Sequence, residues 1–300
     1  MHNQEFIRLR RLAPSIVFAI TLFFFMAVMA QAVPDRSHGL LWEISMDGAL
    51  PSYLFGTIHS EDPGVLMLAG EVQRAFDSSD SVILEVKLDM DAMVYSSRAM
   101  LMTDGRLLSE ITGRALFEKT AKAISTRGIP EVVLERMKPW AAATTLSIPA
   151  PETGMVLDMK LFQDAQQSGK QVYGLETLQE QLGVFESMSE RDQVTLLKDA
   201  VDNFHLIDRM NAELVSAWKQ RDLARMQAIS DEAMQQGDQR LAHDFEKRLI
   251  VDRNRLMAER AEQYLEKGKA FIAVGALHLP GEEGLLNLLE QRGYSVRAIY

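Results

Sequence analysis

Short apolar runs separated by longer amphipathic stretches recur along the chain from about residue 40 to its last residue. Continuous apolar runs of this kind are typical of buried strands, and a helix between two of them allows the strands to pair in parallel. The runs predicted as strands are 40–45, 53–58, 81–86, 171–175, 269–274 and 295–300. We therefore expect an α/β fold, with a mainly parallel or mixed central sheet flanked by helices.

The stretches between these runs carry apolar residues at helical spacing. Helices are predicted at 65–77, 89–103, 116–127, 131–147 with an interruption at Pro139, 156–168, 179–215 with a break near 188–190, 220–264 and 282–292. The first two strands are expected to pair through a turn at Asp47-Gly48. Because no linker of biased composition divides the chain, residues 33–300 are predicted to form a single domain, with a long-helix lobe or cap at about 180–265.

The first residues have the pattern of a secretory signal peptide. Three arginines precede an apolar run from 13 to 30, and Ala30-Gln31-Ala32 supplies small residues at the positions a signal peptidase reads. Residues 1–32 are therefore interpreted as a signal peptide, and the protein as exported, periplasmic or secreted. The alternative is an uncleaved N-terminal anchor. No other stretch is apolar and long enough to span a bilayer, which takes about 20 residues.

Composition excludes several classes of protein. The chain has no cysteine, so it has no disulfide, iron–sulfur cluster, thiolate zinc site or cysteine nucleophile. The 42 acidic and 32 basic residues give a formal charge of −10. A general nucleic-acid binder requires a basic surface, so nucleic acid is not an expected partner.

Two Gly-x-x-His motifs each close a predicted strand. Gly56 lies near the end of the strand at 53–58 and His59 follows it, whereas Gly275 and His278 both follow the strand at 269–274. Ligands of α/β proteins bind at the carboxyl ends of such strands. A single histidine in this position is more often a loop residue or a satisfied core residue, so neither motif alone indicates a site.

Glu85 lies within the apolar run 81–86, where a carboxylate is costly unless it is paired, hydrogen-bonded or bound to a metal. A lone strand glutamate is usually an edge residue or half of an ion pair. Together, however, His59, Glu85 and His278 supply three ligands of the type that manganese, cobalt, zinc or iron accepts, with open positions left for substrate. This conjunction predicts a divalent metal centre.

Arg253 and Asn254 occupy the predicted helix 220–264. Arg253 is four residues after Leu249 and three before Leu256, so it falls within the apolar stripe of that helix. An arginine in such a stripe must be paired or point into a polar cavity. A structural salt bridge to a core acid and a role in a site remain equally open.

Two further acids, Glu176 and Asp158, lie beside or within predicted helices. Glu176 follows the strand at 171–175 and is either another member of the same rim or an acid at the start of the next helix. Asp158, with Lys160, is interpreted as part of a solvated helix face.

These elements together resemble the TraB/PrgY/GumN family, which includes the Tiki proteins. The resemblance rests on GTIH, GALH, the acid of ILEV, the LET after a middle strand, the DRN on a late helix, and the block HLPGEEGLLNLLEQRGYSV. It runs from about Leu40 to Tyr300 and is most similar to the signal-peptide-bearing GumN-type branch of bacteria.

The resemblance implies a fold akin to the erythromycin esterases and the haem-binding ChaN proteins. It implies an active site that contains His59, Glu85 and His278, with Arg253 and Asn254 nearby. Tiki relatives are described as metal-dependent proteases, and the esterase relatives as hydrolases that use a histidine base.

Three functions follow. The favoured one is a metal-dependent hydrolase, a peptidase in particular, with Glu176 or Glu61 as general base, Arg253 stabilising the oxyanion and Asn254 orienting a peptide or small-molecule substrate. The second is a metal-free hydrolase in which His59 is the base and Glu85 orients its ring. The third is a non-catalytic protein that binds haem or a peptide.

Overall fold

A computed structural model describes residues 36–300; the predicted signal peptide, residues 1–32, lies outside this range. Within it, six strands form one mixed sheet in the order β4-β3-β5-β2-β1-β6. The strands are β1 (Leu41–Ser45), β2 (Ser52–Thr57), β3 (Ser81–Val86), β4 (Gln171–Glu176), β5 (Ala270–Gly275) and β6 (Ser295–Ala298). The predicted α/β class with a mixed central sheet is therefore confirmed.

Four neighbouring strands are parallel, and two antiparallel strands complete the sheet. β3 pairs in parallel with β4 and β5, and β5 pairs in parallel with β2. β1 pairs antiparallel with β2 and with β6, and the chain turns between β1 and β2 at Asp47-Gly48, as predicted. The parallel arrangement brings the carboxyl ends of β2, β3, β4 and β5 to one edge of the sheet.

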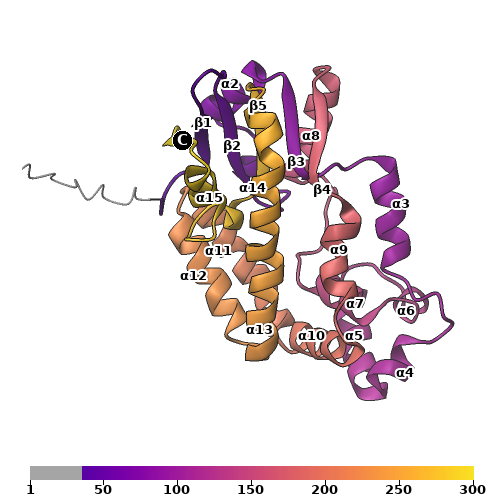
Figure 1. The fold of residues 1–300 in the computed structure, drawn as a ribbon. Coiled ribbons are helices and arrows are strands. Elements are labelled where there is room, and N and C mark those ends of the chain that lie inside the picture. Colours follow the sequence, from indigo (N-terminus) through magenta and orange to yellow (C-terminus); the bar gives the residue numbers. More distant parts are fainter. Residues whose placement is uncertain (1–35) are drawn as a thin grey trace, which may run out of the picture. The chain divides into compact units, whose positions relative to one another are not determined.

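Some helices flank this sheet, and others lie away from it in the lower part of the view in Figure 1. The helices are α1 (Pro63–Leu66), α2 (Gly70–Ser78), α3 (Met90–Ala99), α4 (Leu108–Thr112), α5 (Arg114–Ser125), α6 (Glu131–Leu134), α7 (Pro139–Leu146), α8 (Leu157–Gln167), α9 (Leu178–Glu186), α10 (Glu190–Asp202), α11 (Ile207–Lys219), α12 (Leu223–Met234), α13 (Gln239–Glu246), α14 (Asp252–Leu265) and α15 (Leu285–Gln291). A π-helical turn, Lys247–Val251, joins α13 to α14.

The buried apolar residues form two separate clusters. The larger one joins the sheet to α2, α8, α11, α12, α14 and α15, with Phe55, Phe76 and Phe271 at its centre. The smaller one lies among α4, α5, α7 and α10, around the fully buried Trp140. The helices between 180 and 265, for which the sequence predicts a separate lobe, therefore divide between the two cores.

The helices are shorter than the periodicity predicts, and each interruption has a local cause. Pro139 begins α7 because its ring cannot continue the preceding helix, which ends at Leu134. The predicted helix 220–264 breaks at Gln235–Asp238, where the Asp238 side chain caps α13 by accepting from the Leu241 amide. The predicted break near 188–190 lies between α9 and α10.

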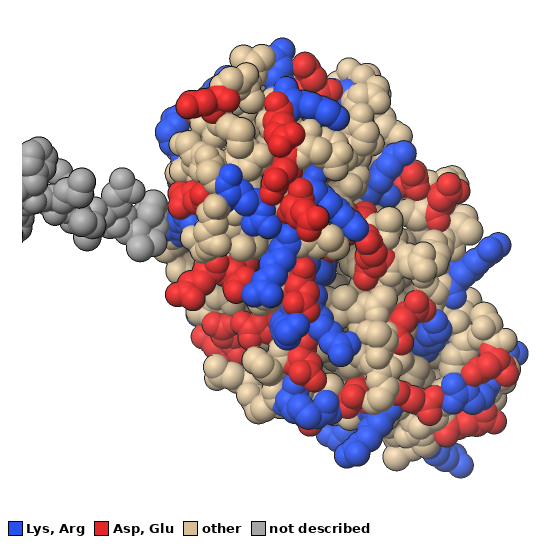
Figure 2. All heavy atoms as spheres, in the orientation of Figure 1, with Lys and Arg blue, Asp and Glu red and all other residues tan. Residues whose placement is uncertain are grey.

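The surface mixes both signs of charge. On the face drawn in Figure 2, lysine and arginine side chains are interspersed with aspartate and glutamate. None of the helices within residues 36–300 combines the length and the apolar character needed to cross a membrane.

Candidate active site at the carboxyl edge of the sheet

The parallel strands bring together residues that are far apart in the sequence. Thr57 of β2 is aligned with Gly275 of β5, and Leu84 of β3 is aligned with Ala273 of β5. The residues that follow or end these strands, His59, Glu85 and His278, therefore lie at one edge of the sheet. Glu176 ends the neighbouring strand β4 and lies at the same edge.

Both motif glycines allow close approach of the backbone. A methyl group on Gly56 would lie 2.8 Å from Leu279 Cδ1 and 3.1 Å from Ala276, so β2 contacts the turn that carries His278. A methyl group on Gly275 would lie 3.1 Å from Glu85 Oε1. The backbone amide of Gly275 donates a hydrogen bond to the same Glu85 oxygen at 2.6 Å. The two glycines thus fix the distance between the motifs and Glu85.

Asn254 fixes the orientation of the His278 ring. Its side-chain amide donates to the Glu283 carbonyl at 2.7 Å, so its Oδ1 accepts from His278 Nδ1 at 2.6 Å. His278 therefore carries its hydrogen on Nδ1, and in the neutral ring Nε2 holds a lone pair. That nitrogen lies 3.5 Å from Glu85 Oε1. Two lone-pair atoms facing each other in a buried site favour a proton or a cation between them.

Burial keeps His278 neutral at physiological pH. It lowers the pKa of His278 from 6.5 to about 4, although the Glu85 carboxylate opposes this effect. Burial acts to raise the pKa of Glu85. The positive charge that His278 carries at the acid pH where Glu85 titrates, together with the charge of Arg253, outweighs this effect. The pKa of Glu85 is lowered, and its carboxylate stays ionised. A neutral imidazole beside an ionised carboxylate is the form that binds a divalent cation.

We expect His278 to make the metal-free protein less stable in mild acid. Because its pKa is about 4 when folded and 6.5 when unfolded, the unfolded chain takes up a proton first as the pH falls through this window. Stability should fall by about 2 kcal/mol between pH 7 and pH 5 from this group alone. Urea unfolding of chelated protein should show this loss in the wild type and in His205→Gln, whose histidine is exposed. An equal loss in His278→Gln would contradict the assignment.

Arg253 joins two carboxylates from different strands. Its Nη2 lies 2.8 Å from an oxygen of Glu85 and 2.8 Å from an oxygen of Glu176, and its Nε donates to Glu176 at 2.9 Å. The Glu176 side chain is 1% exposed and that of Arg253 is 11% exposed. The salt bridge that the sequence left open is therefore present, and it lies within the site. The first turn of α9 is capped by Thr177, not by Glu176.

His59 has a different acidic neighbour. Its Nδ1 lies 4.0 Å from Asp158 Oδ2, and Thr57 donates to the other Asp158 oxygen at 2.9 Å. The His59 side chain is 68% exposed, so its ring reaches solvent. Burial and the nearby Glu85 charge raise the pKa of Asp158. The site thus contains two acid–histidine pairs, one buried and one open to solvent.

Asp158 does not lie on a solvated helix face, which corrects the sequence interpretation. Its side chain is 22% exposed and contacts the end of β2. A signal for this was present in the sequence. Asp158 precedes the buried Leu161 and Phe162 by three and four residues, so it falls within the apolar stripe of α8, as Arg253 does in its own helix.

Glu61 has its own partners outside these pairs. Its carboxylate accepts from the amides of Glu152, Thr153 and Gly154 and from the Thr153 hydroxyl. These bonds to Thr153 lower the pKa of Glu61. A carboxylate held in this way is a weak base, so of the two candidate bases Glu61 is the less suited to accept a proton.

Two of the side chains at the site are spaced as two ligands of one divalent metal ion would be. Two ligands of one tetrahedral ion with bonds near 2.1 Å lie about 3.4 Å apart. His278 Nε2 and Glu85 Oε1 are 3.5 Å apart, and the bond from Nδ1 to Asn254 is the support that metal-bound histidines receive. No group of three or more His, Asp or Glu side chains within residues 36–300 is arranged to hold a metal as it stands.

Comparison with known proteins identifies the family to which the chain belongs. The model of the TraB/PrgY/gumN family matches residues 40–298, which include both Gly-x-x-His motifs, Glu85 and Arg253. The chain belongs to the TraB/PrgY/gumN family. No solved structure matches it significantly.

Relatives of this family member include animal and bacterial proteins. It is 24% identical to Metalloprotease TIKI1 of Danio rerio over 86% of the chain and 63% of that protein, and 24% identical to Metalloprotease TIKI2 of the same fish. The chain thus spans less than two thirds of these relatives. It is 22% identical to the uncharacterized protein YbaP of Shigella flexneri, over 85% of the chain and 94% of YbaP.

Proposed function

We propose that this family member is a metal-dependent hydrolase that cleaves peptide bonds at the carboxyl edge of the sheet. The observation that carries the proposal is the pairing of a neutral His278 with an ionised Glu85, Nε2 to Oε1, 3.5 Å apart. The metalloprotease names of the two Tiki relatives support a peptide substrate. At 24% identity they support the class of reaction and no particular substrate.

His278 and Glu85 would hold the ion, with His59 or Asp158 as the source of a further ligand. A bound manganese, cobalt, zinc or iron ion would supply an acidic water and polarise the scissile carbonyl. Asn254 keeps the His278 lone pair directed toward Glu85. If His59 is not a ligand, its exposed ring would accept a proton from the attacking water, with Asp158 orienting it.

Arg253 has two roles in this proposal. It holds Glu85 and Glu176 in place, and it keeps the pKa of Glu85 low. Burial raises the pKa of Glu176 despite the Arg253 hydrogen bond, so Glu176 is the more basic of the two carboxylates. Because Arg253 is fully engaged by these acids, it stabilises an oxyanion only if substrate displaces one of them.

A metal-free hydrolase is the second candidate, because the His59–Asp158 pair resembles the base and orienting acid of hydrolytic triads. In this version Asp158, rather than Glu85, is the acid next to the base. Cleavage of a quenched peptide library by purified protein, before and after exhaustive chelation, separates the two candidates. Loss of cleavage on chelation and recovery with a divalent ion supports the metal-dependent enzyme. Full activity after chelation supports the His59 base.

We also propose that residues 1–32 direct export and are then removed. The basic residues, apolar run and Ala30-Gln31-Ala32 support this proposal. N-terminal sequencing of protein recovered from the periplasm or medium should begin at Val33. Recovery in the membrane fraction with Met1 intact would show an anchor instead.

A further inference from the structure

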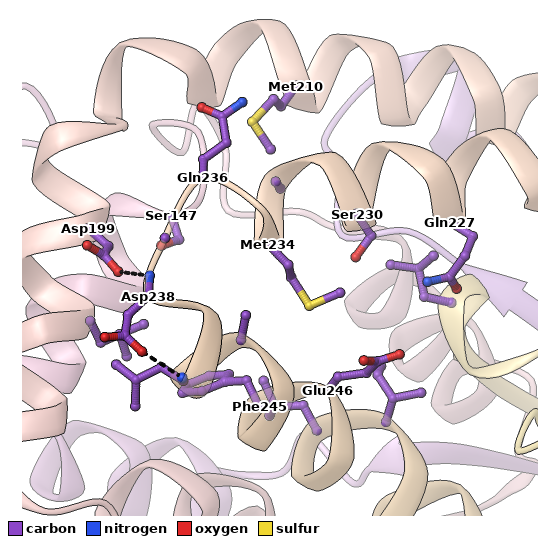
Figure 3. Close-up of a pocket in the computed structure, with 18 of the residues that line it drawn as sticks. Ser147, Asp199, Met210, Gln227, Ser230, Met234, Gln236, Asp238, Phe245 and Glu246 are labelled. Carbon is purple, nitrogen blue, oxygen red and sulfur yellow. Dashed lines mark hydrogen bonds between the residues drawn. The ribbon is translucent and has the colours of Figure 1, made fainter.

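A large cavity is lined by α10, α11, α12 and α13, by the π-helical turn Lys247–Val251 and by residues of the segment 277–284 (Figure 3). Its volume is about 690 Å³, within the range of about 300–1,000 Å³ that small-molecule pockets have. Apolar side chains dominate its wall, among them Leu206, Met210, Met234, Leu241 and Phe245. Figure 3 shows the flexible thioethers of Met210 and Met234 directed toward the open space. Methionines adapt to apolar ligands of varied shape.

The polar part of the wall carries charge of one sign. Five of the lining residues are acidic, and the lining contains no lysine, arginine or histidine. Asp199 and Asp238 accept backbone hydrogen bonds, and Glu283 pairs with Arg255. Among the described residues, neither Glu246 nor Glu282 has an ion-pair partner, and both are exposed. An apolar ligand with a positive group would therefore be favoured over one with a negative group.

The cavity shares a wall with the candidate active site. Leu277 lines it and is adjacent to His278, and the segment 280–284 that follows the histidine lines it as well. The Glu283 carbonyl in that segment accepts from the Asn254 amide, whose oxygen positions the His278 ring. A ligand in the cavity would thus contact the turn that carries His278.

We propose that this cavity is the substrate-binding subsite of the hydrolase and receives a large apolar side chain of a peptide, with neutral or basic residues beside it. The inference rests on the proposed peptidase function for its role, and on the cavity's own lining for the ligand chemistry. Peptides with acidic residues next to the apolar one would be disfavoured by Glu246 and Glu282.

Binding of two simple amphiphiles tests the ligand chemistry without any turnover. Decyltrimethylammonium and decanoate have equally long chains and opposite charges, and neither contains a bond that the enzyme would cleave. Calorimetric titration of the purified protein below the micellar concentrations should show the cation binding at least tenfold more tightly. Equal affinities, or tighter binding of decanoate, would overturn the proposal.

A matched pair of variants locates the binding. Ala233 and Ala224 both belong to α12, but Ala233 lines the cavity, whereas Ala224 is exposed and does not line it. Ala233→Trp should weaken decyltrimethylammonium binding at least tenfold, and Ala224→Trp should leave it unchanged. The double variant Glu246→Gln/Glu282→Gln changes exposed side chains and should reduce the preference for the cation about fivefold or more. Binding that none of these variants alters would place the ligand elsewhere and overturn the proposal.

Peptide cleavage in the same samples separates the two proposals. If the cation binds in the cavity but no peptide is cleaved, the subsite chemistry stands and the hydrolase fails. If peptides are cleaved but neither amphiphile binds, the hydrolase stands and the subsite fails. If both stand, decyltrimethylammonium should inhibit cleavage competitively, and inhibition that is not competitive would contradict the shared subsite.

Discussion

Replacing Arg253 with methionine is expected to lower the free energy of unfolding by about 3–5 kcal/mol. Methionine keeps most of the packing of the side chain but removes the cation between Glu85 and Glu176. Two carboxylates, one of them 1% exposed, would then face each other without a counter-charge. Either they take up protons or the surrounding structure opens, and both responses cost stability. Urea unfolding at pH 7, followed by circular dichroism, measures the loss.

The neighbouring Arg255 provides the control for this experiment. It also pairs with a glutamate, Glu283 at 2.9 Å, but its side chain is 57% exposed. Exposed ion pairs contribute about 1 kcal/mol or less, so Arg255→Met should change stability little. Adding Glu85→Gln and Glu176→Gln to Arg253→Met should recover part of the loss, because the unpaired charges are removed. Equal stability of Arg253→Met and Arg255→Met would show that the buried triad does not support the site.

Replacing His278 with alanine is expected to lower kcat/KM for peptide cleavage by about 10³-fold, as loss of a central catalytic group does. The variant removes the lone pair that faces Glu85. His59→Ala should also reduce activity strongly, and because its side chain is 68% exposed it should leave stability nearly unchanged. His205→Ala, a substitution of an exposed histidine away from the sheet edge, is the matched control and should retain full activity.

Stability measurements accompany these rates. His278 is buried and holds the Asn254 oxygen, so its alanine variant should be somewhat less stable, and activity is compared at a temperature where each variant remains folded. Wild-type activity in a folded His278→Ala protein would remove this histidine from the reaction.

The shared edge of the sheet could be predicted from the sequence because the direction of the strands follows from local patterns. Buried apolar runs separated by helices predict parallel strands, and parallel strands bring their carboxyl ends together. That rule assigns His278 and Glu85 to the same edge, and their proximity requires in addition that β3 and β5 are neighbours, which the sequence does not indicate. The apolar stripe around Arg253 likewise predicts that its charge is paired or points into a polar cavity, although it does not identify Glu85 and Glu176 as the partners.

Other features depend on how helices pack, which local patterns do not determine. Asp158 contacts Thr57 because α8 lies against β3 and β4, with its first turn near the end of β2. The polar residues Asp158 and Lys160, two positions apart, suggest a solvated face, whereas the apolar stripe of α8 indicates burial of Asp158. The second core around Trp140 and the cavity beside Leu277 arise from packing between helices, which the apolar pattern of each single helix does not specify.

The metal content of the purified protein tests the central claim most directly. Elemental mass spectrometry is applied to the wild type, His278→Ala and His59→Ala after incubation with manganese, cobalt, zinc and iron and removal of the excess. We predict close to one ion per wild-type chain, and loss of that ion in folded His278→Ala. A wild-type protein that remains metal-free under all four conditions, or a folded His278→Ala variant that keeps its metal, would contradict a metal-dependent hydrolase centred on His278 and Glu85.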